Sequence, residues 1–140
     1  MKVIHCPLVG HTHWEDALLR LIDTSEFQRL RGIKQTGAVH WVFPGATHTR
    51  FEHSLGVAHL AERFALALQS RQPELEIEPL VFKLAGLAHD MGHGPLSHAY
   101  DAFLADRGAS VAPAELRQHE LRSAALLRHV VRAHNIPLDA

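Results

Sequence analysis

The chain has 140 residues, of which 46% are hydrophobic and 21% are charged, and its formal net charge is −1. This length and hydrophobic content fit one globular domain with a core of its own. The composition excludes the weakly hydrophobic, highly charged class of disordered chains, and it shows no clear footprint for binding nucleic acid.

The location of the protein is predicted from what its ends and its cysteine content exclude. The N-terminal segment MKVIHCPLVG is too short and too polar for a signal peptide, and no apolar run approaches the roughly 18–20 residues of a membrane span. The single cysteine, Cys6, cannot form an internal disulfide and suits a reducing compartment. We therefore expect a soluble, cytoplasmic protein without a membrane partner.

Two short segments of the first half have strand character. Residues 2–5 are closed by Pro7 and Gly10, and residues 38–43 are stopped by Pro44 and the glycine that follows it. We therefore expect one small β ribbon near the N-terminus.

Helices are predicted for the rest of the first half. Apolar residues at helical spacing indicate a helix over residues 14–23, and Thr24 is suited to cap a second short helix. Thr47 or Thr49 can cap a long helix over residues 50–71. The inward stripe of this long helix is expected to include Leu60, Phe64 and Leu68.

The second half also predicts helices. A helix is expected over residues 78–90, with Pro79 in its first turn, and another is expected to begin at Pro95. Residues 107–113 are expected to form a loop, and residues 114–134 a last helix. The chain shows no internal repeat and no linker, so a mainly α fold in a single domain over residues 1–140 is predicted.

The most informative segment is HDMGHGPLSHAYD, which runs from residue 89 to residue 101. His89 and Asp90 end an otherwise apolar helix, and a buried imidazole and carboxylate need something that satisfies them. A divalent cation does so, since neutral histidine and ionised aspartate are both metal ligands. The alternative is a plain C-terminal cap in which His89 meets the helix dipole. His53 favours the metal, because antiparallel helices bring the start of one beside the end of the next.

The same segment holds candidates for phosphate binding and proton transfer. His93 lies between two glycines, which let the backbone come close to phosphate oxygens. His98 and Asp101 are three residues apart on one helical face, so the carboxylate can orient the imidazole for general-acid catalysis. Taken singly, His98 is better explained as a surface residue, and the neighbouring residues favour function.

Beyond these motifs, the chain resembles the HD-domain deoxynucleoside triphosphate triphosphohydrolases, in particular their sterile-alpha-motif and HD-domain branch. The resemblance covers most of residues 14–105 in the right order, with a weaker match beyond. The matching segments are Ile22–Thr24, Phe27–Arg31, Ile33–Gln35, Val42–Ala46, Arg50–Val57, Gln72–Leu75, His89–Asp101 and His119–Glu120. It implies an HD-domain helical bundle that hydrolyses a dNTP at the α-phosphorus, releasing deoxynucleoside and inorganic triphosphate.

The resemblance also implies a metal site and a phosphate site. His53, His89 and Asp90 match three of the four metal ligands of the family. These ligand types suit Fe, Mn, Zn, Ni or Mg nearly alike, so the sequence predicts a divalent ion without identifying it. Arg50 and His93 match residues that contact the substrate phosphates, and a guanidinium provides a fixed fork for phosphate.

Other matched positions concern proton transfer and the sugar. His98 and Asp101 match a catalytic pair, His119 matches a histidine beside the α-phosphate, and His93 joins them as a catalytic candidate. Gln35 matches a residue that reads the sugar 3′-hydroxyl. As a polar loop residue, Gln35 is equally well explained by solvation.

The chain departs from the family in two places. The fourth metal ligand of the family is an aspartate far downstream, and the surroundings of Asp139 do not match it, so we do not assign that residue. Lys2, Asp23, Gln28 and Arg31 match contact positions of an allosteric nucleotide site in the branch. Cys6 and Val9 differ from the residues usual at their positions in that site. A solvated face with a helix cap explains Asp23, Gln28 and Arg31 equally well.

Three functions therefore compete. The first is a metal-dependent phosphohydrolase acting on a dNTP, and the second is another HD phosphomonoesterase or phosphodiesterase. The third is an inactive HD module that binds a nucleotide or a protein partner. Gln35 and Arg50 favour the first. We also expect the chain to be the N-terminal part of a longer HD phosphohydrolase, with little activity alone, and the family implies a homo-oligomer.

Overall fold

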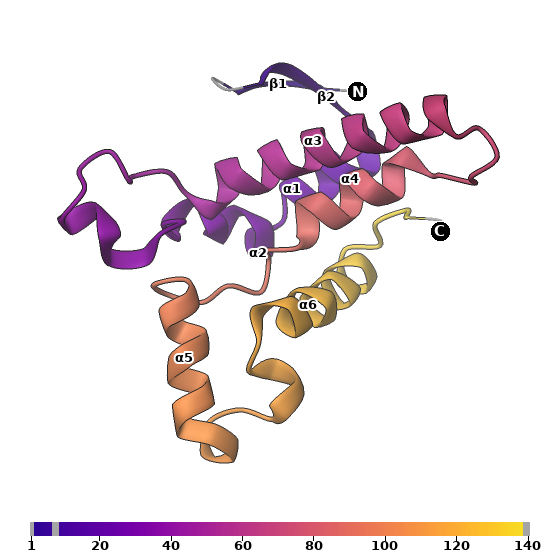
Figure 1. Ribbon diagram of the computed structural model, residues 1–140. Coiled ribbons are helices and arrows are strands. Elements are labelled where there is room, and N and C mark those ends of the chain that lie inside the picture. The colour runs from indigo at the N-terminus through magenta and orange to yellow at the C-terminus, as the bar shows by residue number, and fades with distance from the viewer. Residues whose placement is uncertain (1, 7–8, 139–140) are drawn as a thin grey trace.

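The computed structural model describes residues 2–6 and 9–138, so Pro7, Leu8 and Asp139 lie outside the described residues. Six α-helices, a two-stranded ribbon and short 3₁₀ turns make up the described part (Figure 1). The prediction of a mainly α fold with a small N-terminal ribbon is confirmed. Among the described helices, none is long and apolar enough to cross a membrane.

The ribbon pairs two neighbouring segments rather than distant ones. Strands β1 (Lys2–Cys6) and β2 (Gly10–Trp14) are antiparallel, with Lys2 opposite Trp14. The predicted strand over residues 38–43 is wrong, because Gly37–Trp41 forms a 3₁₀ turn. Gly37 has a φ of 59°, a left-handed conformation that turns the chain before a strand can extend.

Two short helices follow the ribbon. Helix α1 (Asp16–Ile22) begins two residues later than predicted, because Trp14 ends β2 with its side chain fully buried. Helix α2 (Ser25–Gln28) has Thr24 as its N-cap, and the Thr24 side chain accepts a hydrogen bond from the Phe27 amide, as the sequence indicates. A 3₁₀ turn over Arg29–Gly32 continues α2.

Helices α3 (Arg50–Arg71) and α4 (Pro79–Ala88) form the central antiparallel pair (Figure 1). Both were predicted with nearly these bounds. Their backbones come close, since a Cβ added at Gly86 would lie 2.9 Å from the Cα of Ala58. Such an approach requires small residues at the contact.

The predicted inward stripe of α3 is wrong. Leu60 and Phe64 are 58% and 61% exposed, and Leu68 is only partly buried. The buried face instead carries Arg50, Phe51, Ser54, Leu55, Ala58 and Ala65. Apolar spacing predicts the wrong face, because the close approach of α4 at Gly86 puts the small residue Ala58 at the contact.

A buried lysine joins the ribbon to the central helix pair. Lys83 of α4 is 2% exposed, and its Nζ donates a 2.8 Å hydrogen bond to the backbone oxygen of His13. The same ammonium lies 3.0 Å from Glu15 and 3.1 Å from Glu62. A buried cation with this many acceptors fixes the ribbon on α3 and α4.

The last two helices start later than predicted. Leu96 and Ser97 have φ values of 60° and 56°, so Pro95 does not open a helix, and α5 begins after them (His98–Arg107). Residues 108–110 and 114–116 form 3₁₀ turns, and α6 spans His119–Ala133. Helix α6 lies along α4, while α5 projects from the α3–α4 pair (Figure 1).

Candidate metal centre and acid–base group

Three predicted metal ligands meet where the start of α3 lies beside the end of α4. His53 is in the first turn of α3, His89 caps α4, and Asp90 follows it. Asp90 Oδ2 lies 3.5 Å from His53 Nε2 and 3.3 Å from His89 Nε2. These ligand atoms all lie within 4.8 Å of one another, so the three side chains can hold one metal ion.

A backbone contact sets the ring orientation of His89. Its Nδ1 lies 2.6 Å from the backbone oxygen of Gly86. A carbonyl accepts, so we assign the proton to Nδ1, which leaves Nε2 as the free nitrogen facing Asp90. Fixing a ligand through its other ring nitrogen in this way is usual for metal-binding histidines.

Arg50 contacts this group through Asp90, and each nitrogen of its guanidinium donates one hydrogen bond. It is 2% exposed. Nη1 donates to Asp90 Oδ2 at 2.6 Å, Nε donates to Ser97 Oγ at 3.0 Å, and Nη2 donates to the backbone oxygen of Gln35 at 3.1 Å. Arg50 therefore fixes Asp90 and places a buried positive charge next to the candidate metal ligands.

The charge states of this group are shifted by its own contacts, and not all in one direction. Burial alone would lower the pKa of His89, but its contacts with Asp90 and Gly86 outweigh burial and raise that pKa. Burial alone would raise the pKa of Asp90, but polar contacts from His89, His93 and Arg50 outweigh it and hold that pKa far below its ordinary range. Burial lowers the pKa of His53, and it lowers the pKa of His93 as well. An ionised aspartate beside a neutral imidazole is the donor set that a divalent cation requires.

A second group of titratable side chains adjoins the first. His93, His98, Asp101 and His119 place their ligand-type atoms within 4.8 Å of one another. The rings of His93 and His119 are stacked, with centroids 3.9 Å apart, and His98 stands edge-on to both. The two groups are joined by Asp90, whose Oδ1 lies 3.3 Å from His93 Nε2.

Within this group, Asp101 is directed at His119 more closely than at His98. Its Oδ2 lies 2.6 Å from His119 Nδ1 but 3.9 Å from His98 Nδ1. His98 is 70% exposed as a side chain, whereas His119 is 14% exposed. The predicted pairing by helical spacing therefore gives a distant contact, and the close imidazole comes from another helix, α6.

His93 has an unusual environment for a predicted phosphate contact. Its side chain is fully buried, and within the described part of the chain neither ring nitrogen has a hydrogen-bond partner. Nε2 lies 3.3 Å from Asp90 Oδ1, as an ion-pair contact. A buried imidazole with unsatisfied nitrogens is costly unless something else supplies a partner.

Gln35 lies beside Arg50, as its prediction as a substrate contact requires. Its backbone amide donates to His48, and its backbone oxygen accepts from Arg50. The side-chain oxygen Oε1 is buried and has no hydrogen-bond partner among the described residues. Gln35 thus contacts Arg50 through its backbone, and the contact of its side chain with a sugar hydroxyl stays a prediction.

The predicted allosteric residues come from four neighbouring segments: β1, the end of α1, α2 and the 3₁₀ turn after α2. Gln28 donates to the backbone oxygen of Ile22 at 2.8 Å and accepts from Arg31 Nε at 2.7 Å. The Arg31 guanidinium lies 3.6 Å from the centroid of the Phe51 ring. Lys2 and Asp23 are exposed. Gln28 and Arg31 have these structural contacts, and the nucleotide site stays a prediction.

Sequence reasoning missed three polar residues of the site. Ser97 Oγ accepts from Arg50 and donates to the backbone oxygen of Lys34 at 2.6 Å. Arg122 and Ser123 of α6 contact the loop after Asp90. Ser97 lies in the informative segment, and Arg122 follows His119 by three residues on one helical face, which is the signal that was available.

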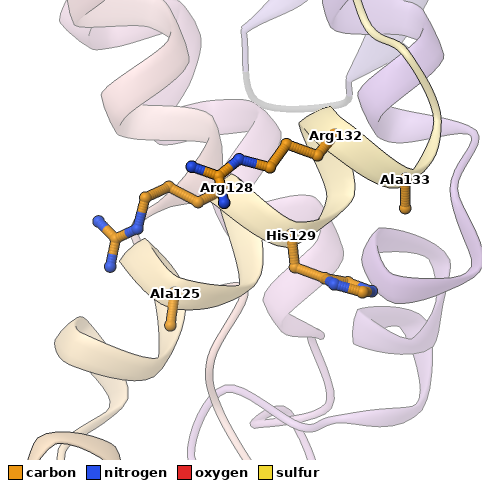
Figure 2. A pocket seen from close by; sticks show the side chains of 5 residues that line it. All are labelled: Ala125, Arg128, His129, Arg132 and Ala133. Carbon is orange, nitrogen blue, oxygen red and sulfur yellow. The ribbon is translucent and has the colours of Figure 1, made fainter.

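A recess farther along α6 lies apart from both groups. It has a volume of about 470 Å³ and is lined by Ala125, Arg128, His129, Arg132 and Ala133, all from α6 (Figure 2). Its lining includes no carboxylate that could complete a metal or acid–base group. We therefore locate the chemistry at the two histidine–aspartate groups and not at this recess.

Comparison with known proteins agrees with this arrangement. The HD domain family model matches residues 50–140. The match covers more than half of the chain and includes both histidine–aspartate groups, so the chain belongs to the HD-domain family.

The chain is also similar to particular proteins along nearly its whole length. It is 46% identical over 140 residues to the deoxynucleoside triphosphate triphosphohydrolase SAMHD1 of Bos taurus, covering 97% of this chain and 23% of the relative. The Homo sapiens protein of that name gives 46% over 140 residues, covering 97% and 22%. The homolog of Dictyostelium discoideum gives 41% over 138 residues, covering 96% and 26%. The chain therefore spans about a quarter of the length of these relatives.

Proposed function

We propose that the chain is a metal-dependent phosphohydrolase that splits a deoxynucleoside triphosphate into deoxynucleoside and triphosphate. The observation that carries this proposal is the position of Asp90 between the two groups. One carboxylate oxygen faces His53 and His89, and the other faces His93, which stacks on His119. A metal centre and a proton-transfer group that share one carboxylate can act on one phosphate.

The residues present fit a divalent cation. His53 and His89 offer Nε2, Asp90 is ionised, and the Nδ1 of His89 is already bonded to Gly86. A cation bound there would polarise a phosphoryl oxygen as a Lewis acid. The donor set is compatible with Fe, Mn, Zn, Ni or Mg, and we propose no choice among them.

The side chains of this chain have distinct parts in the proposed reaction. Water attacks the α-phosphorus and becomes a hydroxyl of the released triphosphate, and the bond from that phosphorus to the 5′-oxygen of the sugar breaks. The second proton of the water returns, through solvent, to the imidazole that protonates the leaving oxygen. The leaving oxygen takes a proton from an imidazole of the second group, His98 or His119. Arg50 holds Asp90 in place and adds a positive charge near the phosphates, as the buried guanidinium is fixed from each side.

Substrate recognition is proposed for Gln35. Its buried Oε1 is an acceptor without a partner among the described residues, and a sugar hydroxyl is a donor. A site built to bond a hydroxyl discriminates strongly against an analogue that lacks it. The printed names of the SAMHD1 relatives support a deoxynucleoside triphosphate as the substrate.

Product analysis tests the proposal. A longer form that contains this chain and a downstream aspartate is incubated with a dNTP and saturating manganese, and chromatography is expected to show deoxynucleoside and triphosphate. Release of pyrophosphate or free phosphate would instead indicate another HD hydrolysis, and nucleotide binding without turnover would indicate an inactive module. His98→Ala is expected to lower kcat far more than it raises KM.

Metal content provides the matched test of the centre itself. His89→Ala and Asp90→Ala are expected to lose bound metal in elemental analysis. His59→Ala is the control, because His59 lies on α3 with His53 but belongs to neither group. Equal metal content in all variants would contradict the assignment of the centre.

A further inference from the structure

The first turns of α6 are fastened to the loop that follows Asp90. Ser123 Oγ donates to the backbone oxygen of His89 at 2.6 Å and accepts from the Gly92 amide at 2.8 Å. Arg122 Nε donates to the backbone oxygen of Gly92 at 2.8 Å. A Cβ added at Gly92 would lie 2.4 Å from the backbone oxygen of His119, so the loop and α6 are in direct contact.

Arg122 also reaches two other segments. Its Nη1 donates to the backbone oxygen of Leu116 at 2.9 Å, and its Nη2 donates to Asp101 Oδ1 on α5. The guanidinium carbon lies 5.3 Å from the centroid of the Tyr100 ring. With a side chain only 15% exposed, Arg122 joins the loop after Asp90, the turn before α6, and α5.

The hydrogen bond from Arg122 determines which imidazole the Asp101 carboxylate contacts closely. Arg122 occupies Oδ1, and His119 Nδ1 lies 2.6 Å from Oδ2. With both oxygens engaged, the carboxylate cannot turn toward His98, which stays 3.9 Å away. Burial alone would raise the pKa of Asp101, but the hydrogen bonds from Arg122 and then His119 outweigh it and lower that pKa.

We propose that Arg122 is a positioning residue of the active site, which holds Asp101 on His119 and ties both to the loop that carries Asp90. This inference rests on the proposed function for its kinetic consequence. Its structural part, the orientation of Asp101 by Arg122, does not depend on turnover. Arg122 touches none of the reacting atoms and acts through Asp101 and the loop.

Substitution of Arg122 is expected to lower kcat and leave KM nearly unchanged. Loss of such a supporting contact typically costs about 10–100-fold in activity. We expect a fall of this size in Arg122→Gln, with KM within about threefold. Arg122→Lys should retain an intermediate kcat, because an ammonium keeps the charge but loses the fork that reaches several partners. Arg128→Ala is the matched control, since it removes an exposed arginine of the same helix.

Chemical rescue separates positioning from folding. A recess of about 350 Å³ adjoins Arg122 and is lined also by Arg29, Gly92 and Leu116. In Arg122→Ala this recess would open toward Asp101. About 20 mM guanidinium, far below the molar concentrations that unfold small domains, is expected to restore part of the lost kcat. Urea at the same concentration and sodium chloride at the same ionic strength should not.

A measurement without turnover keeps the inference distinct from the proposed function. The carboxylate carbon of Asp101 is followed by NMR through an acid titration, in wild type and in Arg122→Gln. The charged or titratable groups that face this carboxylate are His98, His119 and Arg122, with Glu120 next to His119. Loss of Arg122 is expected to raise the midpoint of Asp101.

The titration and the kinetics distinguish failure of the proposed function from failure of the role of Arg122. A raised Asp101 midpoint with no turnover in the wild type would uphold the positioning of Asp101 and count against the proposed function alone. An unchanged Asp101 midpoint in Arg122→Gln, or an unchanged kcat in an active enzyme, would overturn the role of Arg122. If Arg122→Ala fails to fold, the titration of Arg122→Lys and Arg122→Gln gives the same decision.

Discussion

Replacing Gly86 by alanine should separate α3 from α4 and loosen the metal centre. The added Cβ would lie 2.9 Å from the Cα of Ala58 and 3.0 Å from both the amide nitrogen of Ala58 and the backbone oxygen of Val57. Carbon atoms rest about 3.5–4.0 Å apart, so the helices must part by about 0.6–1 Å. All three obstacles are backbone atoms, which cannot rotate away.

The expected cost follows from two opposing effects. Overpacking a core costs about 1–3 kcal/mol, and backbone obstacles favour the upper half of that range. Alanine gains about 1 kcal/mol over glycine in helix propensity. Gly86→Ala should therefore lower the free energy of unfolding by about 1–2 kcal/mol. The same displacement moves His53 away from His89 and Asp90, so manganese affinity should fall by about tenfold.

Gly56→Ala is the control for this substitution. Gly56 lies on α3, and a Cβ added there would meet no atom within 4 Å. It should gain helix propensity alone and raise stability by about 0.5–1 kcal/mol. Urea denaturation and manganese titration of both variants give the comparison. Equal stability changes in the two variants, or unchanged metal affinity in Gly86→Ala, would refute the reasoning.

Two further predictions concern the core of α3 and the acid range. Leu60→Gln should change the free energy of unfolding by less than about 0.5 kcal/mol, because Leu60 is 58% exposed. Leu55→Ala, at a position only 7% exposed, should lower the free energy of unfolding by about 2–4 kcal/mol in a urea denaturation assay. An equally large loss in Leu60→Gln would show that Leu60 belongs to the buried face of α3 after all. The fold lowers the pKa of Asp101, so the ionised carboxylate stabilises the protein above its unfolded value of about 3.9, and this contribution is lost as the pH falls through the lower folded value. Asp101→Asn, measured in chelator, should therefore be less stable at pH 7 and decline less steeply in acid, whereas parallel pH curves would contradict this.

The central helix pair was predictable because local signals set its ends. Thr49 is the N-cap position of α3, although its hydroxyl donates to Glu52 Oε1 and caps no backbone amide. Pro79 occupies the first turn of α4, where a proline is favoured. The buried face of α3 was not predictable from apolar content. It depends on how closely Gly86 lets α4 approach, which is a property of the pair and not of either helix.

The meeting of the three candidate metal ligands was predictable for a related reason. His53, His89 and Asp90 lie at the ends of helices that are consecutive in the chain, and a short connection makes such helices antiparallel neighbours. The partner of Asp101 was not predictable in this way. His119 comes from α6, and its approach depends on the turns between α5 and α6 and on the contact at Gly92.

Arginines distant in sequence hold the loop after α4 through its backbone oxygens, and this explains why Arg122 was missed. Arg29 donates to the backbone oxygens of Met91 and His93, and Arg122 donates to that of Gly92. A guanidinium that bonds carbonyls places no demand on the side chains of the loop. The side chains of His89, Asp90 and His93 are therefore not needed to hold this loop and can make the contacts of the two histidine–aspartate groups. Sequence motifs contain the side chains that are candidates for chemistry. The arginines that hold the loop come from the turn after α2 and from α6, so their role depends on the tertiary packing.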